Sequence, residues 1–316
     1  MNSLTVALIF PGQGSQSVGM GKALADVFPA SRAVFAEVDD ALGEKLSSTM
    51  WEGPADTLTL TRNAQPALMA VSIAALSALK ASGAKIEGNV AWVAGHSLGE
   101  YSALAAAGSF TVGEAARLLR IRGDAMQAAV PLGEGAMAAI VGLDFDGVKA
   151  VADAAADGQV CSVANDNGAG QVVVSGHKAA VERAIALAQE RGAKRAILLP
   201  VSAPFHCELM KPAAEAMAAA LAKTPPRAPA IPLVANISAA PVTDAEEIRR
   251  GLVEQVTGVV RWRESVAWLA ANGVDCFIEV GAGKVLSGLV RRIAPQAATL
   301  AVGAPDDIPA ALDRLR

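Results

Sequence analysis

Short apolar runs alternate along the chain with longer segments that are rich in alanine and leucine. Turn residues bound the short runs, which is typical of buried strands, whereas the longer segments place apolar residues at a helical spacing. The runs that predict strands of one sheet are Val6–Phe10, Val90–Ala94, Leu233–Asn236, Cys276–Val280 and Thr299–Val302. This alternation predicts an α/β fold in which helices cover a mostly parallel sheet.

A segment in the middle of the chain follows a different order. Its predicted strands are Gly135–Leu143, Val160–Ala164, Gln171–Ser175 and Arg195–Pro200, and its predicted helices are Phe145–Ala155 and Lys178–Arg191. A strand-helix-strand-strand-helix-strand order, with a turn at Asn165–Gly168 between the middle strands, is typical of a ferredoxin-like unit. We therefore expect a small subdomain at 131–199, inserted into a larger hydrolase-like α/β domain made of 1–130 and 200–316. Ligand sites favour such junctions.

Composition limits the class of protein. A chain of 316 residues can bury a large core, and its hydrophobic fraction of 53% owes much to alanine in helices. The best apolar stretch, Pro66–Leu79, is too short to cross a membrane. Residues 1–10 lack the basic start of a signal peptide and predict a first buried strand instead.

Charge and cysteine content narrow the partners and the compartment. The net charge of −4 gives the chain no overall basic character, so we expect no nucleic-acid partner. The cysteines Cys161, Cys207 and Cys276 are far apart in the sequence and form no C-x-x-C pair. We therefore expect a reduced, cytoplasmic protein with neither a disulfide framework nor a metal site.

The most informative motif is the G-x-S-x-G sequence Gly95–Gly99, which lies between an apolar run and the helical segment Tyr101–Ala107. In a nucleophile elbow the serine occupies a sharp strand-to-helix turn, and the glycines let strand and helix approach closely. The start of the helix supplies N–H groups for a developing oxyanion. Ser97 is therefore predicted to be a nucleophile; the alternative is an ordinary tight turn with a buried serine.

A nucleophilic serine needs a base, and the chain has three histidines. His96 adjoins Ser97, where successive side chains diverge, and His177 precedes a predicted helix, which favours a surface or capping role. His206 is the best base by elimination, although a structural histidine in a proline-bounded loop is the alternative. No aspartate is an obvious partner for it, so a backbone carbonyl or an amide could orient its ring. Cys207 is a rival thiol nucleophile with poor geometry, because its own histidine is adjacent.

A second signal is Arg122, in a helix predicted from Glu114 to Ala129. The apolar face of that helix collects Ala115, Leu118, Leu119, Met126 and Ala129, with Arg122 in its middle. A guanidinium on a buried face is costly unless it is paired with an anion. The anion is either an acidic residue of the same chain or a carboxylate on the substrate.

Two glycine-rich loops do not meet the requirements of phosphate sites. Phe10–Gln16 lacks the lysine of a P-loop and the glycine spacing of a dinucleotide site. Gly281–Lys284 has Ile278 at the position of the first P-loop glycine and Val285 in place of the hydroxyl residue. Nucleotide hydrolysis is therefore excluded.

The motifs stand in an order that resembles a known family. They are Phe10–Gln16, Asn63–Leu68, Gly95–Ser102, Arg122, Gly135–Met137, Asn165, Gly170–Val173, Pro200–Ser202, His206 and Glu279–Ala282. Together they resemble the malonyl-CoA:acyl carrier protein transacylases of type II fatty acid synthesis, over essentially the whole chain. The family fold is a hydrolase-like α/β core with a ferredoxin-like insertion, in agreement with the prediction above.

The resemblance implies a catalytic role for each matching residue. Ser97 would be the acylated nucleophile and His206 its base, while Gln255 would orient the histidine through its backbone carbonyl. The backbone N–H groups of Gln13 and Leu98 would form the oxyanion hole.

The resemblance also implies substrates and a pocket. Arg122 would bind the malonyl carboxylate, and Gln13, Met126, Asn165 and Phe205 would contact the substrate. The ring of Phe205, at a position that varies in this family and its polyketide relatives, should narrow the pocket and favour malonyl over branched acyl units. The partners would be malonyl-CoA and holo acyl carrier protein; no cofactor, metal or membrane is implied.

The carrier protein is acidic whereas this chain is itself net negative, so docking requires a local basic patch. The candidates are Lys194, Arg195, Arg291 and Arg292, for which solvated surface charge is the alternative reading. The motifs are compatible with a carrier of fatty acid or polyketide synthesis. Rival functions are a serine hydrolase, which has no need of a buried arginine, and a non-catalytic module that docks a carrier protein.

Overall fold

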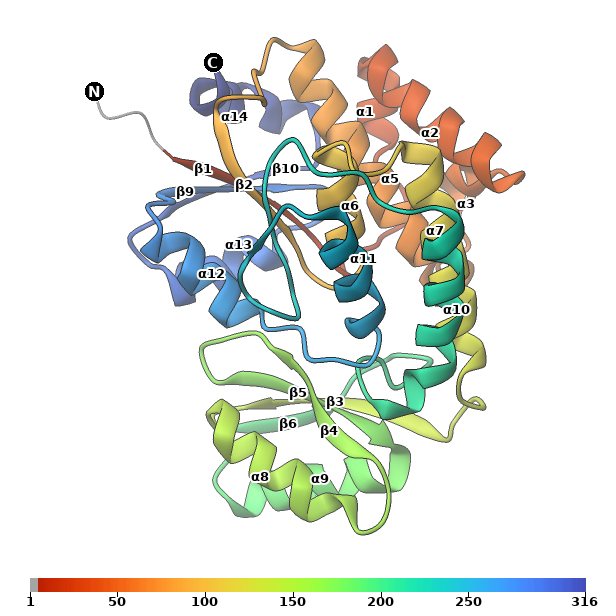
Figure 1. Ribbon diagram of the computed structural model, residues 1–316, viewed down its shortest axis with the longest axis vertical. Helices are drawn as coiled ribbons and strands as arrows, with labels where there is room; N and C mark the ends of the chain where they lie inside the picture. The colour runs from red at the N-terminus through yellow and green to blue at the C-terminus, as the bar shows by residue number, and fades with distance from the viewer. Residues whose placement is uncertain (1–4) are drawn as a thin grey trace.

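The computed structural model describes residues 5–316, and its framework is two separate sheets (Figure 1). Residues 1–4, the start of the predicted first strand and of the larger domain, lie outside the described residues. The larger sheet has the strand order β10-β9-β1-β2-β7-β8, and all neighbours are parallel except β7 and β8. Its strands are β1 (Val6–Phe10), β2 (Val90–Gly95), β7 (Leu233–Val234), β8 (Pro241–Val242), β9 (Cys276–Val280) and β10 (Ala298–Val302). The predicted α/β fold with a mostly parallel sheet is confirmed.

One predicted strand of this sheet is shorter than expected. The run Leu233–Asn236 forms a strand only to Val234, after which the chain turns into the antiparallel partner β8. Asn236 leaves the sheet because its side chain bonds to the turn after β2, where Oδ1 accepts from Ser97 N and Nδ2 donates to Gly95 O. The sequence pattern missed this antiparallel edge.

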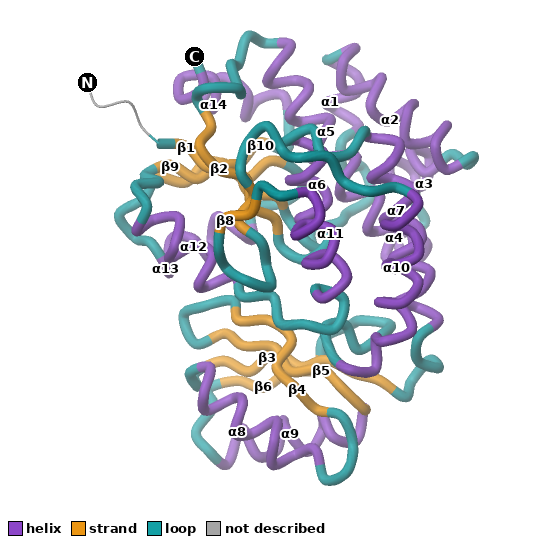
Figure 2. Tube along the Cα trace, viewed as in Figure 1, coloured by secondary structure: helices purple, strands orange, loops and turns teal. Residues whose placement is uncertain are grey.

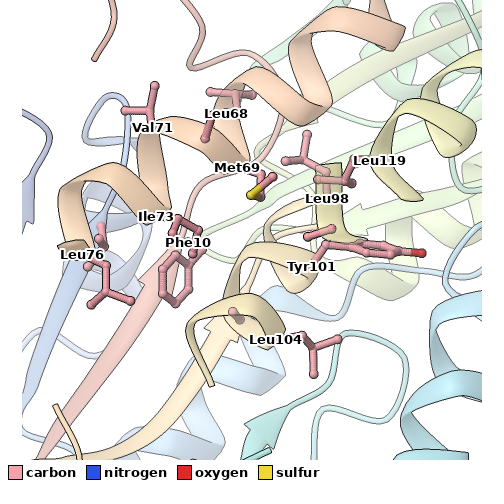
Figure 3. Close-up of a cluster of buried hydrophobic side chains, with 14 of the residues drawn as sticks. Phe10, Leu68, Met69, Val71, Ile73, Leu76, Leu98, Tyr101, Leu104 and Leu119 are labelled. Carbon is pink, nitrogen blue, oxygen red and sulfur yellow. The ribbon is translucent and has the colours of Figure 1, made fainter. Parts of the chain in front are cut away.

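Helices pack on the larger sheet, and the longest of those described is α5 (Thr61–Ala81), a largely buried helix (Figure 2). They are α1 (Lys22–Val27), α2 (Pro29–Leu42), α3 (Leu46–Glu52), α4 (Ala55–Thr59), α5 (Thr61–Ala81), α6 (Gly99–Ala106), α7 (Val112–Ala128), α10 (Lys211–Lys223), α11 (Ala245–Glu254), α12 (Trp262–Ala271), α13 (Val285–Ile293) and α14 (Ile308–Leu315), with short 3₁₀ turns at Glu208–Met210 and Pro305–Asp307. Leu68, Met69 and Val71 of α5 lie among buried side chains that include Leu98 and Tyr101 near the start of α6 (Figure 3).

The helix α5 corrects one argument from the sequence. It contains the stretch Pro66–Leu79 but begins with the polar residues Thr61 and Arg62, so it is 21 residues long and could span a membrane by length and composition. Length therefore does not exclude a span. Burial identifies α5 as a core helix, since 83% of its apolar 18-residue stretch is buried inside the protein.

The smaller sheet is antiparallel, with the order β4-β5-β3-β6. Its elements are β3 (Gly135–Val141), α8 (Phe145–Ala156), β4 (Cys161–Asp166), β5 (Gln171–His177), α9 (Lys178–Glu190) and β6 (Arg195–Leu198). The predicted order of a ferredoxin-like unit is confirmed, and α8 and α9 pack on the sheet around a hydrophobic core of their own. The expected division into 131–199 and 1–130 with 200–316 falls in the connections that flank this unit and stays a prediction.

A short backbone pairing joins the two parts of the structure. Asp166 N donates to Val260 O at 2.9 Å, and Val260 N donates to Ala164 O at 2.9 Å. Beside this pairing, Arg263 Nε lies 2.8 Å from the buried carboxylate of Asp166. The edge strand β4 is thus held against the segment between α11 and α12, and this contact fixes one wall of the cleft described next.

Candidate active site

The sharp turn after β2 has the geometry of a nucleophile elbow. Ser97 has a φ of 53°, a left-handed conformation that costs energy for a residue with a side chain. A Cβ at Gly95 would lie 1.9 Å from Gly99 O, and one at Gly99 would lie 2.2 Å from Phe10 O. Both positions therefore require glycine, and the strained serine projects its hydroxyl away from the packed backbone.

A histidine and a carbonyl complete a relay to this hydroxyl. Ser97 Oγ lies 2.7 Å from His206 Nε2, and His206 Nδ1 lies 2.8 Å from Gln255 O. Because a carbonyl only accepts, Nδ1 carries the proton, which leaves Nε2 free to accept the serine hydrogen. Burial, followed by the nearby charge of Arg122, lowers the pKa of His206 to about 3, so the imidazole is neutral at physiological pH.

Arg122 is 1% exposed and lies behind the serine. Its Nη1 donates to Gln65 Oε1 at 2.8 Å, and its Nη2 donates to Gln255 Oε1 at 2.8 Å and to Ser97 Oγ at 3.1 Å. Within the part of the chain that the structure describes, the guanidinium forms no salt bridge and its Nε has no hydrogen-bond partner. Among residues 5–316 the direct intramolecular ion pair considered from the sequence is not found, so no carboxylate touches the guanidinium beside the nucleophile.

The backbone around the serine offers donors for an oxyanion. A Cβ at Gly12 would lie 2.8 Å from His96 O, so the loop after β1 packs directly against the elbow and brings Gln13 beside it. Among residues 5–316, the N–H groups of Gln13 and Leu98 donate to no protein acceptor. Both N–H groups are thus available for an oxyanion, and their assignment to that role stays a prediction.

A cavity of about 370 Å³ opens in front of these groups. Its lining residues are Gln13, Gly14, Gln16, Thr59, Gln65, His96, Ser97, Leu98, Arg122, Met126, Met137, Asn165, Leu199, Pro200, Val201, Phe205 and His206. The predicted contacts Met126, Asn165 and Phe205 all lie on its wall. Lys194, Arg195, Arg291 and Arg292 are exposed and lie outside it, although Arg292 lines an adjoining cavity of about 270 Å³.

The other histidines and the rival thiol have structural environments. His96 is held by Asn167 at 2.8 Å, and burial lowers its pKa. His177 does not cap α9 with its side chain as considered above; its Nδ1 accepts from Val160 N at 2.9 Å instead. Burial raises the pKa of the Cys207 thiol, whose Sγ donates to Pro204 O, so the thiol is neither ionised nor aimed at the cavity.

Sequence reasoning assigned no role to Gln65, Glu100 and Asn236. Gln65 and Glu100 lie within motifs that carry the resemblance, and each is a polar residue in a helix that is otherwise largely buried. That contrast was an available signal. Asn236 gave none, because its contacts with the elbow join residues 139 and 141 positions apart.

Comparison with known proteins places this geometry in a class. Residues 7–303 match the model of the acyl transferase domain. The malonyl CoA-acyl carrier protein transacylase of Bacillus subtilis (strain 168) is 48% identical over 312 residues, which are 98% of this chain and 97% of that protein. The chain is thus an acyltransferase.

Two solved structures narrow the class. The acyl-carrier-protein-S-malonyltransferase from Bartonella henselae is 57% identical, covers 99% of both chains and has a TM-score of 0.97. A malonyl-transacylase in complex with a type II PKS acyl-carrier protein is 43% identical, covers 98% of this chain and 99% of that chain, and has a TM-score of 0.95. The chain belongs to the malonyl CoA-acyl carrier protein transacylase family.

Proposed function

We propose that this chain carries out the malonyl transfer of its family, from malonyl-CoA to acyl carrier protein in fatty acid synthesis, through a covalent malonyl ester on Ser97. The observation that carries the proposal is Arg122. It is a buried cation without an acidic contact in the described chain, and its Nη2 lies 3.1 Å from Ser97 Oγ. A carboxylate beside the thioester carbonyl is the group that such a cation selects.

In the first half-reaction, Ser97 Oγ attacks the thioester carbonyl carbon of malonyl-CoA while His206 Nε2 takes the hydroxyl proton. The N–H groups of Gln13 and Leu98 stabilise the tetrahedral oxyanion. The carbon–sulfur bond then breaks, and coenzyme A leaves as a thiol with the proton from His206.

In the second half-reaction, the thiol of the carrier's phosphopantetheine arm gives its proton to His206 and attacks the malonyl ester. The carbon–oxygen bond breaks, and the proton returns from His206 to Ser97 Oγ. One imidazole serves both steps because its Nδ1 stays bonded to Gln255 O throughout.

The walls of the cavity fit a small acyl group. Met126 and Phe205 supply apolar surface, and Asn165 supplies an amide from β4. The ring of Phe205, next to the base, leaves little room for a branch on the acyl chain, so we propose a preference for malonyl over methylmalonyl units.

The carrier would dock on exposed basic residues outside the substrate cavity: Lys194 and Arg195 at β6, and Arg291 and Arg292 in the last turn of α13. Their exposure and their charge complement an acidic partner. Arg292 lines the adjoining cavity. A cytoplasmic location is consistent with the buried free thiols of Cys161, Cys207 and Cys276.

The test is intact-mass analysis after incubation with malonyl-CoA. We expect one malonyl adduct on the protein and none on Ser97→Ala, because the elbow presents no other hydroxyl to His206. Holo carrier protein added next should collect the group. Release of free malonate in place of transfer would make the protein a hydrolase, and an undiminished adduct on Ser97→Ala would move the nucleophile elsewhere.

A further inference from the structure

Behind Arg122 lies a buried acidic side chain that the mechanism above does not use. Glu100 lies in the first turn of α6 and is 3% exposed. Its carboxylate accepts a hydrogen bond from Gln255 Nε2 and a longer one, 3.4 Å, from Asn236 N. An ionisable group in such a place requires a physical explanation.

The side-chain amide of Gln255 connects Glu100 to Arg122. Its Oε1 accepts from Arg122 Nη2 at 2.8 Å, while its Nε2 donates to the Glu100 carboxylate and, at 3.0 Å, to Ser97 O. An amide has two chemically different ends, and an ionised carboxylate can only accept. Glu100 and the Ser97 carbonyl, as two acceptors, therefore together fix which end of the amide faces the guanidinium: with the amide reversed, two N–H donors would meet.

The same arrangement places the Glu100 carboxylate near Arg122 without a direct hydrogen bond between them. A carboxylate in direct contact would neutralise Arg122 and take the edge that a substrate needs. Glu100 instead lies one amide away, so Arg122 Nε stays unpartnered among the described residues. Burial raises the pKa of Glu100 to about 7, against the opposing effects of the Gln255 hydrogen bond and the Arg122 charge.

A second cavity gives solvent a route to this carboxylate. It has a volume of about 370 Å³, is lined by Glu100, Ser238, Arg250 and Glu254 among others, and shares no lining residue with the substrate cavity. Glu100 therefore faces this cavity, whose lining mixes polar and apolar residues, on one side and the Gln255 amide on the other.

We propose that Glu100 is a specificity-determining positioning residue: acting through the Gln255 amide, it holds Arg122 in place for a substrate carboxylate and keeps it out of a direct ion pair. The inference rests on the proposed role of Arg122. It predicts that replacing Glu100 slows the transfer of malonyl groups and has little effect on the transfer of acyl groups without a carboxylate.

The experiment compares Glu100→Gln with wild type, using malonyl-CoA and acetyl-CoA as separate substrates. We expect the ratio of kcat/KM for malonyl-CoA to that for acetyl-CoA to fall roughly tenfold or more, mainly through a higher KM for malonyl-CoA. The reason is that the hydrogen bond from Arg122 to Gln255 Oε1 is weakened, so the guanidinium is held less firmly for the substrate carboxylate. The matched control is Glu254→Gln, which removes one charge from an exposed residue of the same rear cavity and should leave the ratio unchanged. Gln255→Met breaks the relay from its other end and should lower the ratio in the same direction.

A double variant separates this role from a merely structural one. In an Arg122→Ala background, adding Glu100→Gln should not change the ratio further, because the residue that it positions is gone. An unchanged ratio in the folded single variants, or an equal additional loss without Arg122, would overturn the inference. If Arg122→Ala itself left the ratio unchanged, the proposed function of Arg122 would be wrong instead.

Discussion

Ser97 and His206, which belong to the part of the chain built around the larger sheet, have φ angles of 53° and 58°. The smaller sheet adds Met137 of β3 and Asn165 of β4 to the same cavity, and neither has such a left-handed backbone. The strained residues are held by hydrogen bonds of 2.7 and 2.8 Å and place the reacting atoms. The strand residues contribute surface and contact neither of those atoms by hydrogen bond within the described chain. Among the residues that line the cavity, left-handed backbone at a residue with a side chain therefore occurs on the side that performs bond making, and the other side shapes the pocket. Asp157 and Ala169 of the smaller unit are also left-handed, but they do not line this cavity.

If this comparison is correct, the largest effect comes from the base. His206→Ala should give a folded protein whose acylation by malonyl-CoA is slowed roughly a hundred- to ten-thousand-fold, since a general base contributes that much. Single-turnover acylation followed by intact mass measures it, with a thermal melt on the same sample. A near-wild-type rate would remove His206 from the mechanism.

The next largest effect concerns selectivity. Arg122→Ala should lower kcat/KM for malonyl-CoA roughly a hundred-fold, because a charge-assisted hydrogen bond in a partly buried site is lost. Acetyl transfer should persist or rise, and Arg122→Lys should recover little, since an ammonium lacks the planar fork. Parallel loss for both thioesters together with a lower Tm would instead assign Arg122 a structural role.

A smaller effect sharpens the comparison through pH. Because burial and Arg122 hold the pKa of His206 at about 3, the ring stays unprotonated well below neutral pH. We expect kcat/KM for acylation to change little between pH 7.5 and 5.5, where a histidine with an ordinary pKa would lose activity about tenfold. A tenfold fall centred near pH 6.5 would contradict this environment.

The smallest effect should come from the exposed basic residues proposed for docking of the carrier protein. Lys194→Glu combined with Arg291→Glu should slow transfer to the carrier protein roughly fivefold and weaken its salt dependence, while acylation by malonyl-CoA is spared. Arg191→Glu, an exposed charge at the end of α9, is the matched control and should leave both half-reactions unchanged. Equal loss in both half-reactions would indicate misfolding.

The sequence predicted the groups whose role is local. Ser97 is marked by glycines within two positions on each side, and Arg122 by the period of one helix, so neighbouring residues contain the signal. Asn236, Gln65 and Gln255 act across the fold, and no spacing encodes such contacts; Gln255 was reached only through the family resemblance. The shortened strand at Leu233 has the same cause, since the bond of Asn236 to the elbow outweighs the local preference for a strand.

The segment that begins at Gln255 has a consequence for exchanging parts between relatives. Gln255 O orients the ring of His206, and Val260, five positions on, pairs with β4. Transplanting a foreign inserted unit in place of residues 131–199 would preserve every reacting side chain and still disturb the base if its edge strand met Val260 in a different register. Whether a foreign unit is compatible with this catalytic domain thus depends on the few backbone atoms that pair β4 with Val260, rather than on the sequence of the pocket.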